Sequence, residues 1–448
     1  MKILLLAPHP FFQQRGTPIA ERMLLEVLTA HGHQVDVLTF PEGEDVDLPG
    51  CRILRIPRPP FVRDIRPGFS VKKLACDAVM LGKTLALVRR NRYDLVHAVE
   101  ESAFMALVAR WLFGTPYVYD MDSGLARQMT DKFPVLGKIR RLLDGFESLA
   151  VRGAVGTLAV CKSLEDQARA CHPGGLVARI EDVSLLADDG GGEEDDVPQG
   201  GPIVMYVGNL EAYQGIDLLV EAFRRALPEV PDARLAIIGG SAADVAAYRE
   251  RCATLGLGES VWLAGPRPVE RLAAYLRRAT LLVSPRIHGD NTPMKVYSYL
   301  DSGRPLLATR LPTHTQVLTD EIACLADPEP EAMARGLVKL LRDRDLRERL
   351  AANAREYAQR ELTRDAFARK VLRFYELIEA RVGGESTAAP PRVETRGSQW
   401  PSLQDGVDAH QPLSVPQGQP FPSPGFQPGV VAPPLPVGSG AMGEGDGG

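Results

Sequence analysis

Short apolar runs alternate with amphipathic stretches along the first half of the chain. Strand-like runs occur at 3–7, 34–39, 94–98, 116–120 and 155–160. Helical patterns separate them, at about 18–31, 70–91, 102–113 and 136–153. Apolar strands that alternate with helices are typical of a parallel sheet covered on both faces. The first half therefore predicts an α/β domain of the doubly wound type.

The same alternation begins again after residue 202. Strand-like runs lie at 203–207, 234–238, 260–263, 281–284 and 305–308. Helical patterns lie near 215–227, 242–255, 268–278 and 293–302. We therefore expect a second doubly wound domain, with ligands bound in the crevice at the carboxyl ends of the strands.

Changes in composition set the domain boundaries. We place the first domain at 1–180, the second at 202–362 and a further helix at 363–383. The segment 181–201 has eight acidic residues, no basic ones and five glycines, which predicts a flexible, self-repelling linker. Calcium binding by this linker is the alternative, but its acidic residues lack the spacing of an EF-hand loop.

Residues 384–448 form a tail of low complexity, with 24 Gly or Pro in 65 positions. Such a segment buries too little apolar surface to offset the entropy lost on ordering. We predict that it is disordered. A solvated extension and a docking segment for a partner are the two roles open to it.

Composition narrows the class of protein. The 448 residues are 45% hydrophobic and 24% charged with a formal net charge of −5, which is typical of a soluble globular protein and argues against a nucleic-acid partner. Six scattered cysteines without a C-x-x-C pair indicate reduced thiols in the cytosol. The opening apolar run is too short for a signal peptide, and no run approaches the roughly 18 residues that span a bilayer. We expect a cytoplasmic protein.

Basic residues are concentrated in the segment 52–92. It holds eleven Lys or Arg against two acidic residues, with Phe61 and Phe69 between them. A basic segment with aromatic residues suits an anionic membrane surface or a phosphate-bearing acceptor. A peripheral contact with the inner face of the membrane is one hypothesis, and an ordinary solvated loop and helix face is the other.

The first strand of the second domain runs into a turn that contains glycine. Residues 205–210 read Met-Tyr-Val-Gly-Asn-Leu, and 213–219 read Tyr-Gln-Gly-Ile-Asp-Leu-Leu. Gly208 and Gly215 allow a ligand to approach the backbone, where N–H groups can face an anion. Glycine after a strand is common, so this turn alone is a weak indication.

The segment 284–303 is the most specific one in the chain. It reads Ser-Pro-Arg-Ile-His-Gly-Asp-Asn-Thr-Pro-Met-Lys-Val-Tyr-Ser-Tyr-Leu-Asp-Ser-Gly. Thr292 suits a helix N-cap, Pro293 the first helical turn and Gly303 the end of the helix.

The start of this helix is a candidate diphosphate site. Its free N–H groups and positive dipole end favour an anion. Arg286 and Lys295 can neutralise that anion, since a buried unpaired charge is costly. Ser298 and Asp301 share a helix face one turn deeper, where they can meet a ribose diol. The alternative is an ordinary capped helix with exposed charges.

These motifs resemble the group 1, family 4-type glycosyltransferases of the GT-B fold over roughly residues 1–381. In the first half, the matching pieces are Arg15-Gly16-Thr17, Gly32-His33 and Tyr-Asp-Leu-Val-His at 93–97. In the second half, they are Val-Gly-Asn-Leu, Gln-Gly-Ile-Asp and the block that begins Pro-Met-Lys-Val-Tyr-Ser. The resemblance implies that the last helix, 363–383, crosses back onto the first domain.

The resemblance also assigns donor-binding positions, with departures from the family pattern. Two glutamates eight positions apart in the family correspond here to Asp290 and Ser298, and its Arg and Lys beside the first glycine turn correspond to Asn209 and Gln214. The phosphate charge then falls more heavily on Arg286 and Lys295. The expected donor-binding residues are Gly16, Gly208, Asn209, Gln214, Gly215, Arg286, Asp290, Asn291, Thr292, Pro293, Met294, Lys295, Ser298 and Asp301.

The first domain is expected to hold the acceptor. In the resembled family a polar residue at a strand end lies beside the reacting carbon, and here the strand 116–120 ends in Asp120-Met121-Asp122-Ser123. Asp122, Asp120 and His97 are the candidate catalytic residues, since a carboxylate can accept the acceptor's proton. A packed structural role is the alternative for His97. Asp-x-Asp is also the metal-binding signature of the GT-A fold, against which the two-domain pattern argues.

Together the motifs imply transfer of a sugar from a nucleotide-diphosphate donor to an acceptor hydroxyl. The resemblance implies retention of configuration, no obligatory metal and no cofactor, and favours a lipid-linked or envelope saccharide as acceptor. The alternative is a catalytically silent relative that binds a nucleotide sugar or acts as a scaffold. The departures at Ser298, Asn209 and Gln214 are the motive for that alternative.

Overall fold

The computed structural model describes residues 1–13, 16–60, 62, 63, 65, 70–125, 129, 139–186, 197, 198, 200–289 and 291–384. Most of the expected linker and all of the expected tail after its first residue lie outside the described residues.

Seven strands form the first sheet, and every pair of neighbours in it is parallel. Their order is β3-β2-β1-β4-β5-β6-β7, so the strand order reverses between β1 and β4. Ligands bind beside such a reversal in doubly wound sheets. The strands are β1 (Lys2–Ala7), β2 (Gln34–Thr39), β3 (Cys51–Arg55), β4 (Leu95–Val99), β5 (Tyr117–Met121), β6 (Gly156–Ala159) and β7 (Val177–Arg179).

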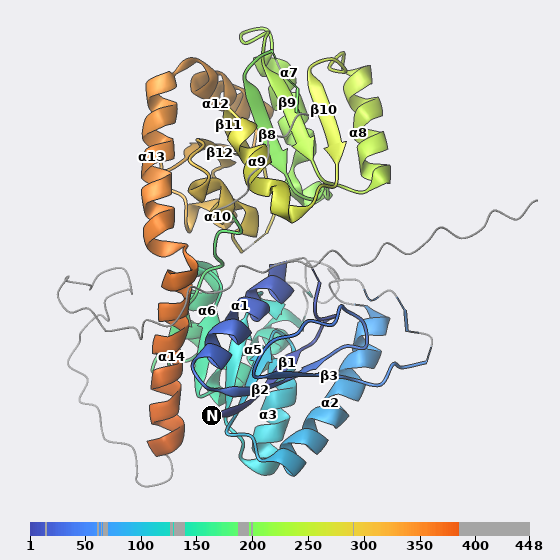
Figure 1. The fold of residues 1–448 in the computed structure, drawn as a ribbon, viewed down its shortest axis with the longest axis vertical. Coiled ribbons are helices and arrows are strands. Elements are labelled where there is room, and N and C mark those ends of the chain that lie inside the picture. Colours follow the sequence, from blue (N-terminus) through green and yellow to red (C-terminus); the bar gives the residue numbers. More distant parts are fainter. Residues whose placement is uncertain are drawn as a thin grey trace, which may run out of the picture. The chain divides into compact units, whose positions relative to one another are not determined.

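Helices cover both faces of this sheet (Figure 1). Along β1, Leu4 and Leu6 face one core and Ile3 and Leu5 the other, because side chains alternate along a strand. The first core includes α2 (Val71–Asn91), α3 (Ser102–Phe113), α5 (Arg140–Gly153) and α6 (Lys162–Cys171). The second includes α1 (Gly16–Ala30) and α14 (Arg364–Gly384).

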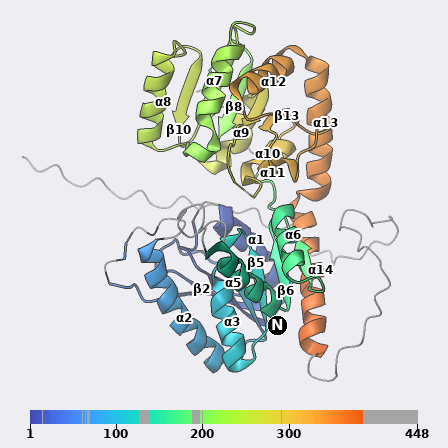
Figure 2. The same cartoon turned by 180° about the vertical axis from the view of Figure 1, so that it is seen from behind.

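Helix α14 belongs to the first domain although it ends the described chain. Phe367, Val371, Phe374 and Ile378 are buried in the core that contains β1 and α1. The opposite view shows α14 beside α6 and β6 (Figure 2). The helix that the resemblance places on the first domain thus contributes to its core.

Six parallel strands form the second sheet. Their order is β10-β9-β8-β11-β12-β13, which repeats the reversal of the first sheet, here between β8 and β11. The expected α/β fold with two doubly wound domains is confirmed. The strands are β8 (Ile203–Val207), β9 (Arg234–Ile238), β10 (Val261–Gly265), β11 (Leu281–Ser284), β12 (Leu306–Thr309) and β13 (Cys324–Ala326).

Two cores flank the second sheet as well. One contains α7 (Ile216–Ala226), α8 (Ala242–Thr254), α12 (Pro330–Arg342) and the start of α13 (Arg344–Glu361). The other contains α9 (Leu272–Arg278), α10 (Met294–Asp301) and the end of α13. The short helix α11 (Pro312–Thr315) follows β12. Within the described ranges, none of the helices has the length and apolar character that a membrane crossing requires.

Candidate functional site

The expected donor site lies where the strand order of the second sheet reverses. Strands β8 and β11 are direct neighbours, with Leu281 beside Val204 and Leu282 beside Met205. Gly208 follows the end of β8, and the loop from Pro285 to Pro293 follows the end of β11. The glycine turn and the loop before α10 lie far apart in the sequence. They therefore meet at the carboxyl ends of these two central strands.

Lys295 joins these two loops. Its ammonium donates to the hydroxyl of Tyr206 at 2.7 Å and to Oε1 of Gln214 at 3.1 Å, and it lies 4.0 Å from the centroid of the Tyr206 ring. Among the described residues, no carboxylate forms an ion pair with it. Burial, and then the charge of Arg286, lower the pKa of Lys295 well below its usual value. Among the described residues, the site therefore offers no counter-charge to this amine.

Two glycines let the backbone pack tightly around this amine. A Cβ at Gly208 would lie 2.3 Å from Nζ of Lys295, and a Cβ at Gly215 would lie 2.0 Å from the carbonyl oxygen of Pro285. Both residues have positive φ, +150° and +73°, which a side chain disfavours. Larger residues at either position would displace Lys295 or the loop that follows β11.

Arg286 organises the loop after β11. Its guanidinium donates to the carbonyl of His288 at 2.7 Å and to the carbonyl of Asn291 at 3.2 Å, and it lies 5.1 Å from the ring centroid of Tyr213. The side chain is buried. It therefore holds the chain that leads into α10 and adds a second positive charge near Lys295.

The start of α10 differs from the expected cap. Pro293, not Thr292, is the N-cap residue, and no side chain caps the helix. The hydroxyl of Thr292 is buried without a hydrogen-bond partner among the described residues. No described acceptor takes the backbone N–H groups of Met294 and Lys295. These N–H groups remain available to an anion at the positive end of the helix.

The remaining expected donor residues differ in their burial and contacts. Ser298 is fully buried, and its hydroxyl accepts from the N–H of Leu185 at 3.0 Å, so the structure does not present it to a ribose. Asp301 is half-buried, Asn209 is exposed, and Asp290 lies outside the described residues. At Gly16, a Cβ would meet no described atom within 4 Å, so packing does not require glycine there.

The candidate catalytic residues lie at the carboxyl edge of the first sheet. Asp120 is in β5 and Asp122 follows that strand. Burial, and then the charges of Asp120, Glu100 and Asp182, raise the pKa of Asp122 well above its usual value. Burial and Asp120 also raise the pKa of Asp182 to about 7. Part of this carboxylate cluster therefore holds protons near neutral pH.

His97 is buried and does not face a ligand. Its exposed fraction is 0%. Its Nε2 lies 3.0 Å from Oδ2 of Asp120, and its Nδ1 lies 2.7 Å from the hydroxyl of Tyr375 on α14. These contacts favour the packed structural role that the sequence left open for His97, and a catalytic role for it stays a prediction. The residue positions Asp120 and connects it to α14.

Two other histidines at these edges were not expected from the sequence. His9 follows β1, and its Nε2 lies 3.1 Å from Glu21 of α1. Burial opposes the charged imidazole, but Glu21 outweighs it and raises the pKa of His9. His9 lies just beyond a predicted strand. A position near the end of a predicted strand is also what made His97 a candidate.

His314 lies behind the loop after β11. It contacts the hydroxyl of Ser284 at 2.8 Å and the carbonyl of Thr309 at 2.9 Å. Burial lowers its pKa to about 4, so it is neutral at physiological pH. Thr309 in turn donates to the carbonyl of Arg286 at 2.5 Å. No pattern in the sequence marks this support, because it depends on the contact between two strand ends.

Among the described residues, the Asp120-x-Asp122 pair does not belong to a group of side chains arranged around a metal ion. Within the described residues, no group of three or more His, Cys, Asp or Glu side chains is arranged to hold a metal ion. At the donor site, Lys295 and Arg286 are therefore the charge-neutralising side chains that we assign to a diphosphate.

Comparison with known proteins identifies the family. A profile described as Glycosyl transferases group 1 matches residues 193–357, and one described as Glycosyl transferase 4-like domain matches residues 16–174. The two profiles cover the second sheet and all of the first sheet except β1 and β7. The chain belongs to the group 1 glycosyltransferases. The resemblance expected from the motifs is confirmed.

This glycosyltransferase has relatives that match most of its length. It is 25% identical over 395 residues to the D-inositol 3-phosphate glycosyltransferase of Corynebacterium efficiens, covering 80% of this chain and 91% of the relative. It is 25% identical over 411 residues to the phosphatidyl-myo-inositol mannosyltransferase of Mycolicibacterium smegmatis, covering 89% and 99%.

Solved structures with the GT-B fold are similar to this glycosyltransferase. Sucrose-phosphate synthase from Thermosynechococcus elongatus has a TM-score of 0.69 at 21% identity, covering 85% of this chain and 99% of the other. HepE from Anabaena, solved in complex with UDP and glucose, has a TM-score of 0.61 at 15% identity, covering 84% and 99%. The expected GT-B fold is confirmed.

Proposed function

We propose that this glycosyltransferase moves a sugar from a nucleoside-diphosphate donor to an acceptor hydroxyl, with retention of configuration and without an obligatory metal. The observation that carries the proposal is the half-buried Lys295, which has no counter-charge among the described residues and lies beside Arg286 and the free N–H groups of α10. A buried cation is costly unless an anion compensates it. A diphosphate supplies that compensation.

In the transfer step, the bond between the sugar's anomeric carbon and the diphosphate oxygen breaks, and a bond to the acceptor oxygen forms. Lys295, Arg286 and the N–H groups of α10 stabilise the charge that develops on the departing diphosphate. They provide the neutralisation for which other enzymes use a divalent ion, which supports a metal-independent reaction. Family membership is the support for retention.

The acceptor's proton leaves as its oxygen attacks, and it passes to the departing phosphate oxygen or to a carboxylate of the first domain. Asp122 and Asp120 are the carboxylates placed for this role. His97 fixes Asp120 through the 3.0 Å contact with its Oδ2. Its connection to Tyr375 places the orientation of Asp120 under the control of α14.

For the acceptor, we propose a lipid-linked molecule, either an inositol phospholipid or a lipid-linked saccharide. Two relatives carry inositol phosphate or phosphatidyl-myo-inositol in their names. Several large apolar residues of α3 and α5, and the N-cap of α5, are exposed, and we call them the apolar surface: Trp111, Leu112, Phe113, Ile139, Leu142, Phe146 and Leu149. Apolar surface of this kind on a soluble domain marks an interaction site.

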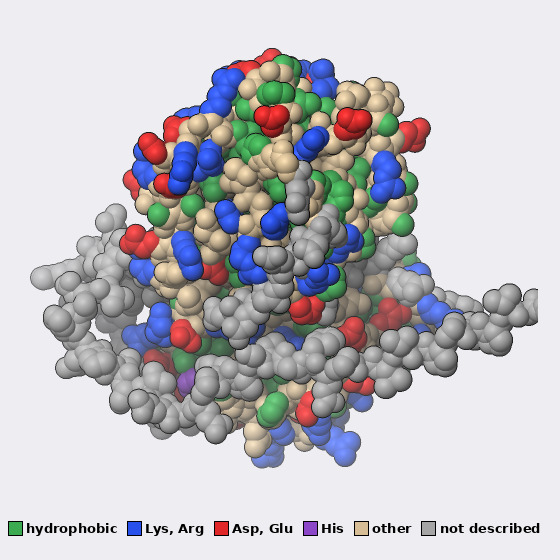
Figure 3. Space-filling view, turned by 45° about the horizontal axis from the view of Figure 1, so that its top comes forward, with side chains coloured by type: hydrophobic (Ala, Val, Ile, Leu, Met, Phe, Trp, Pro, Cys, Tyr) green, Lys and Arg blue, Asp and Glu red, His purple; other side chains and the backbone are tan. Residues whose placement is uncertain are grey.

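The apolar surface suits the membrane that would present such an acceptor. Leu142, Phe146 and Leu149 lie on one face of α5, since residues four and seven apart align. Arg140 and Arg141 flank them, which favours an anionic bilayer. On the face drawn in Figure 3, basic and acidic side chains are interspersed instead of forming one continuous basic surface.

We therefore propose α3 and α5, not the basic segment 52–92 alone, as the membrane-facing elements. Lys73 of that segment faces inward and pairs with Glu101. Its pKa is raised because Glu101 and Glu100 outweigh the effect of burial. Lys73, one of the basic residues that the sequence analysis considered for a membrane contact, therefore forms an ion pair within the domain.

The test of the donor site is Lys295→Ala, with Lys339→Ala on the exposed face of α12 as the control. We expect the site variant to lower sugar transfer from its nucleotide sugar about a hundredfold, because it removes a charge that stabilises the leaving group. The control should keep full turnover. Both should keep the melting temperature of the unaltered protein to within a few degrees.

A panel of UDP-, GDP- and ADP-sugars supplies the donors for this assay, in buffer with and without chelator. Unchanged turnover of Lys295→Ala would contradict the donor site. Turnover that is lost with chelator and restored by Mg²⁺ would contradict metal independence. Nucleotide binding without transfer to any acceptor would favour the silent relative.

A further inference from the structure

A second concave site lies beside the amino end of β11 in the second sheet. Its cavity has a volume of about 620 Å³. Its walls come from the chain before β11 (Arg278–Thr280), the loop between α10 and β12 (Gly303–Pro305) and the first half of α13. Thr280 precedes β11 whereas Ser284 ends it, so this cavity and the donor site lie at opposite ends of the same strand.

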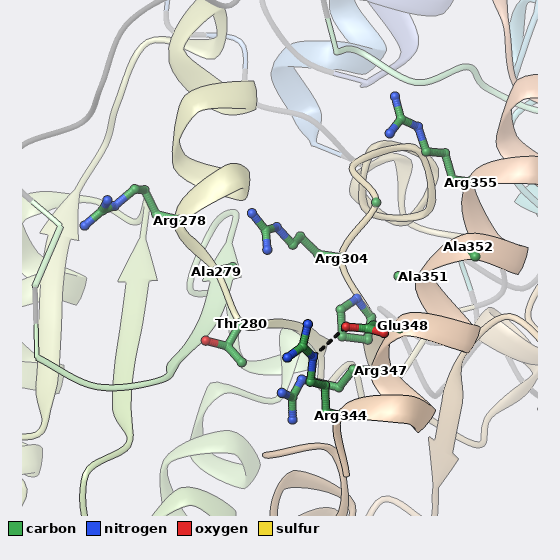
Figure 4. A pocket seen from close by; sticks show the side chains of 12 residues that line it. Arg278, Ala279, Thr280, Arg304, Arg344, Arg347, Glu348, Ala351, Ala352 and Arg355 are labelled. Atoms are coloured by element: carbon green, nitrogen blue, oxygen red, sulfur yellow. Dashed lines mark hydrogen bonds and ion pairs between the residues drawn. The ribbon is translucent and has the colours of Figure 1, made fainter. Parts of the chain in front are cut away.

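The cavity is strongly basic. It contains one acidic side chain, Glu348, which pairs with Arg344 at 2.6 Å. Figure 4 shows Arg304 between Arg278 on one side and the side chains of α13 on the other. We call the basic residues that line it the arginine pocket: Arg278, Arg304, Arg344, Arg347 and Arg355.

Four of these arginines have no acidic partner among the described residues. No described carboxylate forms an ion pair with Arg278, Arg304, Arg347 or Arg355. The guanidinium of Arg304 is half-buried and donates to the carbonyl of Arg277. Burial lowers the pKa of Arg304, which shows that the surrounding protein does not compensate its charge.

The pocket is built on fixed elements. Arg347 donates to the carbonyls of Leu340 and Leu341 at 2.7 and 2.8 Å, which holds it against the end of α12. Ala351 of α13 is buried at the wall. Small side chains along α13 leave the hollow open, while arginines from three separate segments surround it.

We propose that the arginine pocket binds a soluble small molecule that carries at least two phosphate charges. Guanidinium groups match the oxygens of phosphate in paired hydrogen bonds. Like charges held together in a partly buried site repel one another unless an anion compensates them. A concave hollow of this volume encloses a molecule of sugar-phosphate or nucleotide size.

Titration calorimetry with inorganic pyrophosphate tests the proposal on the full-length protein. The donor site also suits pyrophosphate, so Lys295→Ala is titrated beside the double variant Arg304→Gln/Arg355→Gln. The matched control is Arg335→Gln/Arg349→Gln, at exposed positions of α12 and α13 outside the pocket. Measurements at about 50 mM salt limit the screening of the charges.

We expect Lys295→Ala to retain pyrophosphate binding in the arginine pocket. The double pocket variant should weaken this binding at least about tenfold, while its affinity for UDP and its melting temperature stay unchanged. Arg355→Gln alone, at an exposed position, should give a smaller loss in the same direction. The control should bind like the unaltered protein.

Equal binding by the pocket variants and the control would overturn the proposal, as would absence of pyrophosphate binding to Lys295→Ala. Loss of binding to anionic vesicles in the pocket variants, without loss of pyrophosphate binding, would assign these arginines to a lipid and overturn the soluble ligand. If the proposed donor site were wrong, the unaltered protein would not bind UDP. The failure of the donor site and the failure of the arginine pocket are therefore distinguishable.

Discussion

Lys295 is the residue on which the donor site depends. Its amine is enclosed by Tyr206, Gln214 and the glycine turn, with a second cation nearby and no described carboxylate beside it. A lysine held in this way loses its proton more readily than one in water. Binding of a diphosphate reverses that effect, because the anion favours the charged amine.

Donor affinity should therefore depend on pH. As pH rises through the lowered pKa of Lys295, the free protein increasingly lacks the ammonium charge, so a proton must be taken up when UDP binds. Affinity should then fall by up to about tenfold per pH unit. Lys295→Arg should weaken this dependence, since arginine stays charged. Calorimetry in two buffers of different ionisation enthalpy measures the proton uptake; equal slopes for both proteins would count against the assignment.

Individual site residues were predictable where local sequence determined them. Lys295, Arg286 and the glycines follow strand ends, and strand ends follow from hydrophobic patterning. The burial of Ser298 against Leu185 was not predictable, because it depends on where the chain from the first domain passes. The cap at Pro293 instead of Thr292 likewise depends on how Arg286 holds the preceding loop.

At the scale of elements, α14 contributes to both the core and the candidate catalytic edge of the first domain. Its apolar residues pack with β1 and α1, while Tyr375 reaches His97. The helix thus fixes the imidazole that contacts Asp120. Its role in orientation is separable from its role in packing, because one hydroxyl carries the first and several apolar side chains carry the second.

Tyr375→Phe should separate these roles. Loss of one buried hydrogen bond costs about 1 kcal/mol, so we expect kcat to fall several-fold and its pH profile to shift, with donor affinity unchanged. Tyr357→Phe on α13 is the control, since the Tyr357 hydroxyl has no hydrogen-bond partner among the described residues. Equal pH profiles for the two variants would reduce Tyr375 to a packing residue.

The central strands and the edge strand β10 were predictable, whereas the edge strands β3, β7 and β13 were not. Strands such as β4 are buried along their whole length and appear as continuous apolar runs. At the edges, β3 has one exposed and four half-buried residues, and β13 has only three residues, all half-buried. Edge strands need fewer apolar side chains, so hydrophobic patterning alone does not reveal them.

At the scale of the whole molecule, the alternation of strands and helices predicted two similar domains, and their matching strand orders confirm it. The apolar surface on α3 and α5 was not predictable in this way. Residues 102–113 have the composition of a buried helix, yet Trp111 is 65% exposed at its end. The exposure of a helix depends on which other elements cover it. The hydrophobic pattern of that helix alone does not show which elements these are.

Co-sedimentation with liposomes tests the role of this surface. We expect the protein to pellet with vesicles that contain phosphatidylglycerol, and Leu142→Ser/Phe146→Ser to remain largely in the supernatant, because burial of each side chain in the bilayer contributes about 2 kcal/mol. Leu377→Ser, at an exposed position of α14, is the control. Equal pelleting of both variants would contradict the surface we assign.

The position of α14 has a consequence for biosynthesis. The core around β1 stays incomplete until the ribosome has made Phe367 and the residues after it, long after the strands of that domain have emerged. At typical rates of translation, the second domain alone occupies roughly eight to thirty seconds. Throughout that interval a nascent chain exposes an apolar face of its first sheet, so a chaperone that shields such faces during synthesis would protect this enzyme from aggregation.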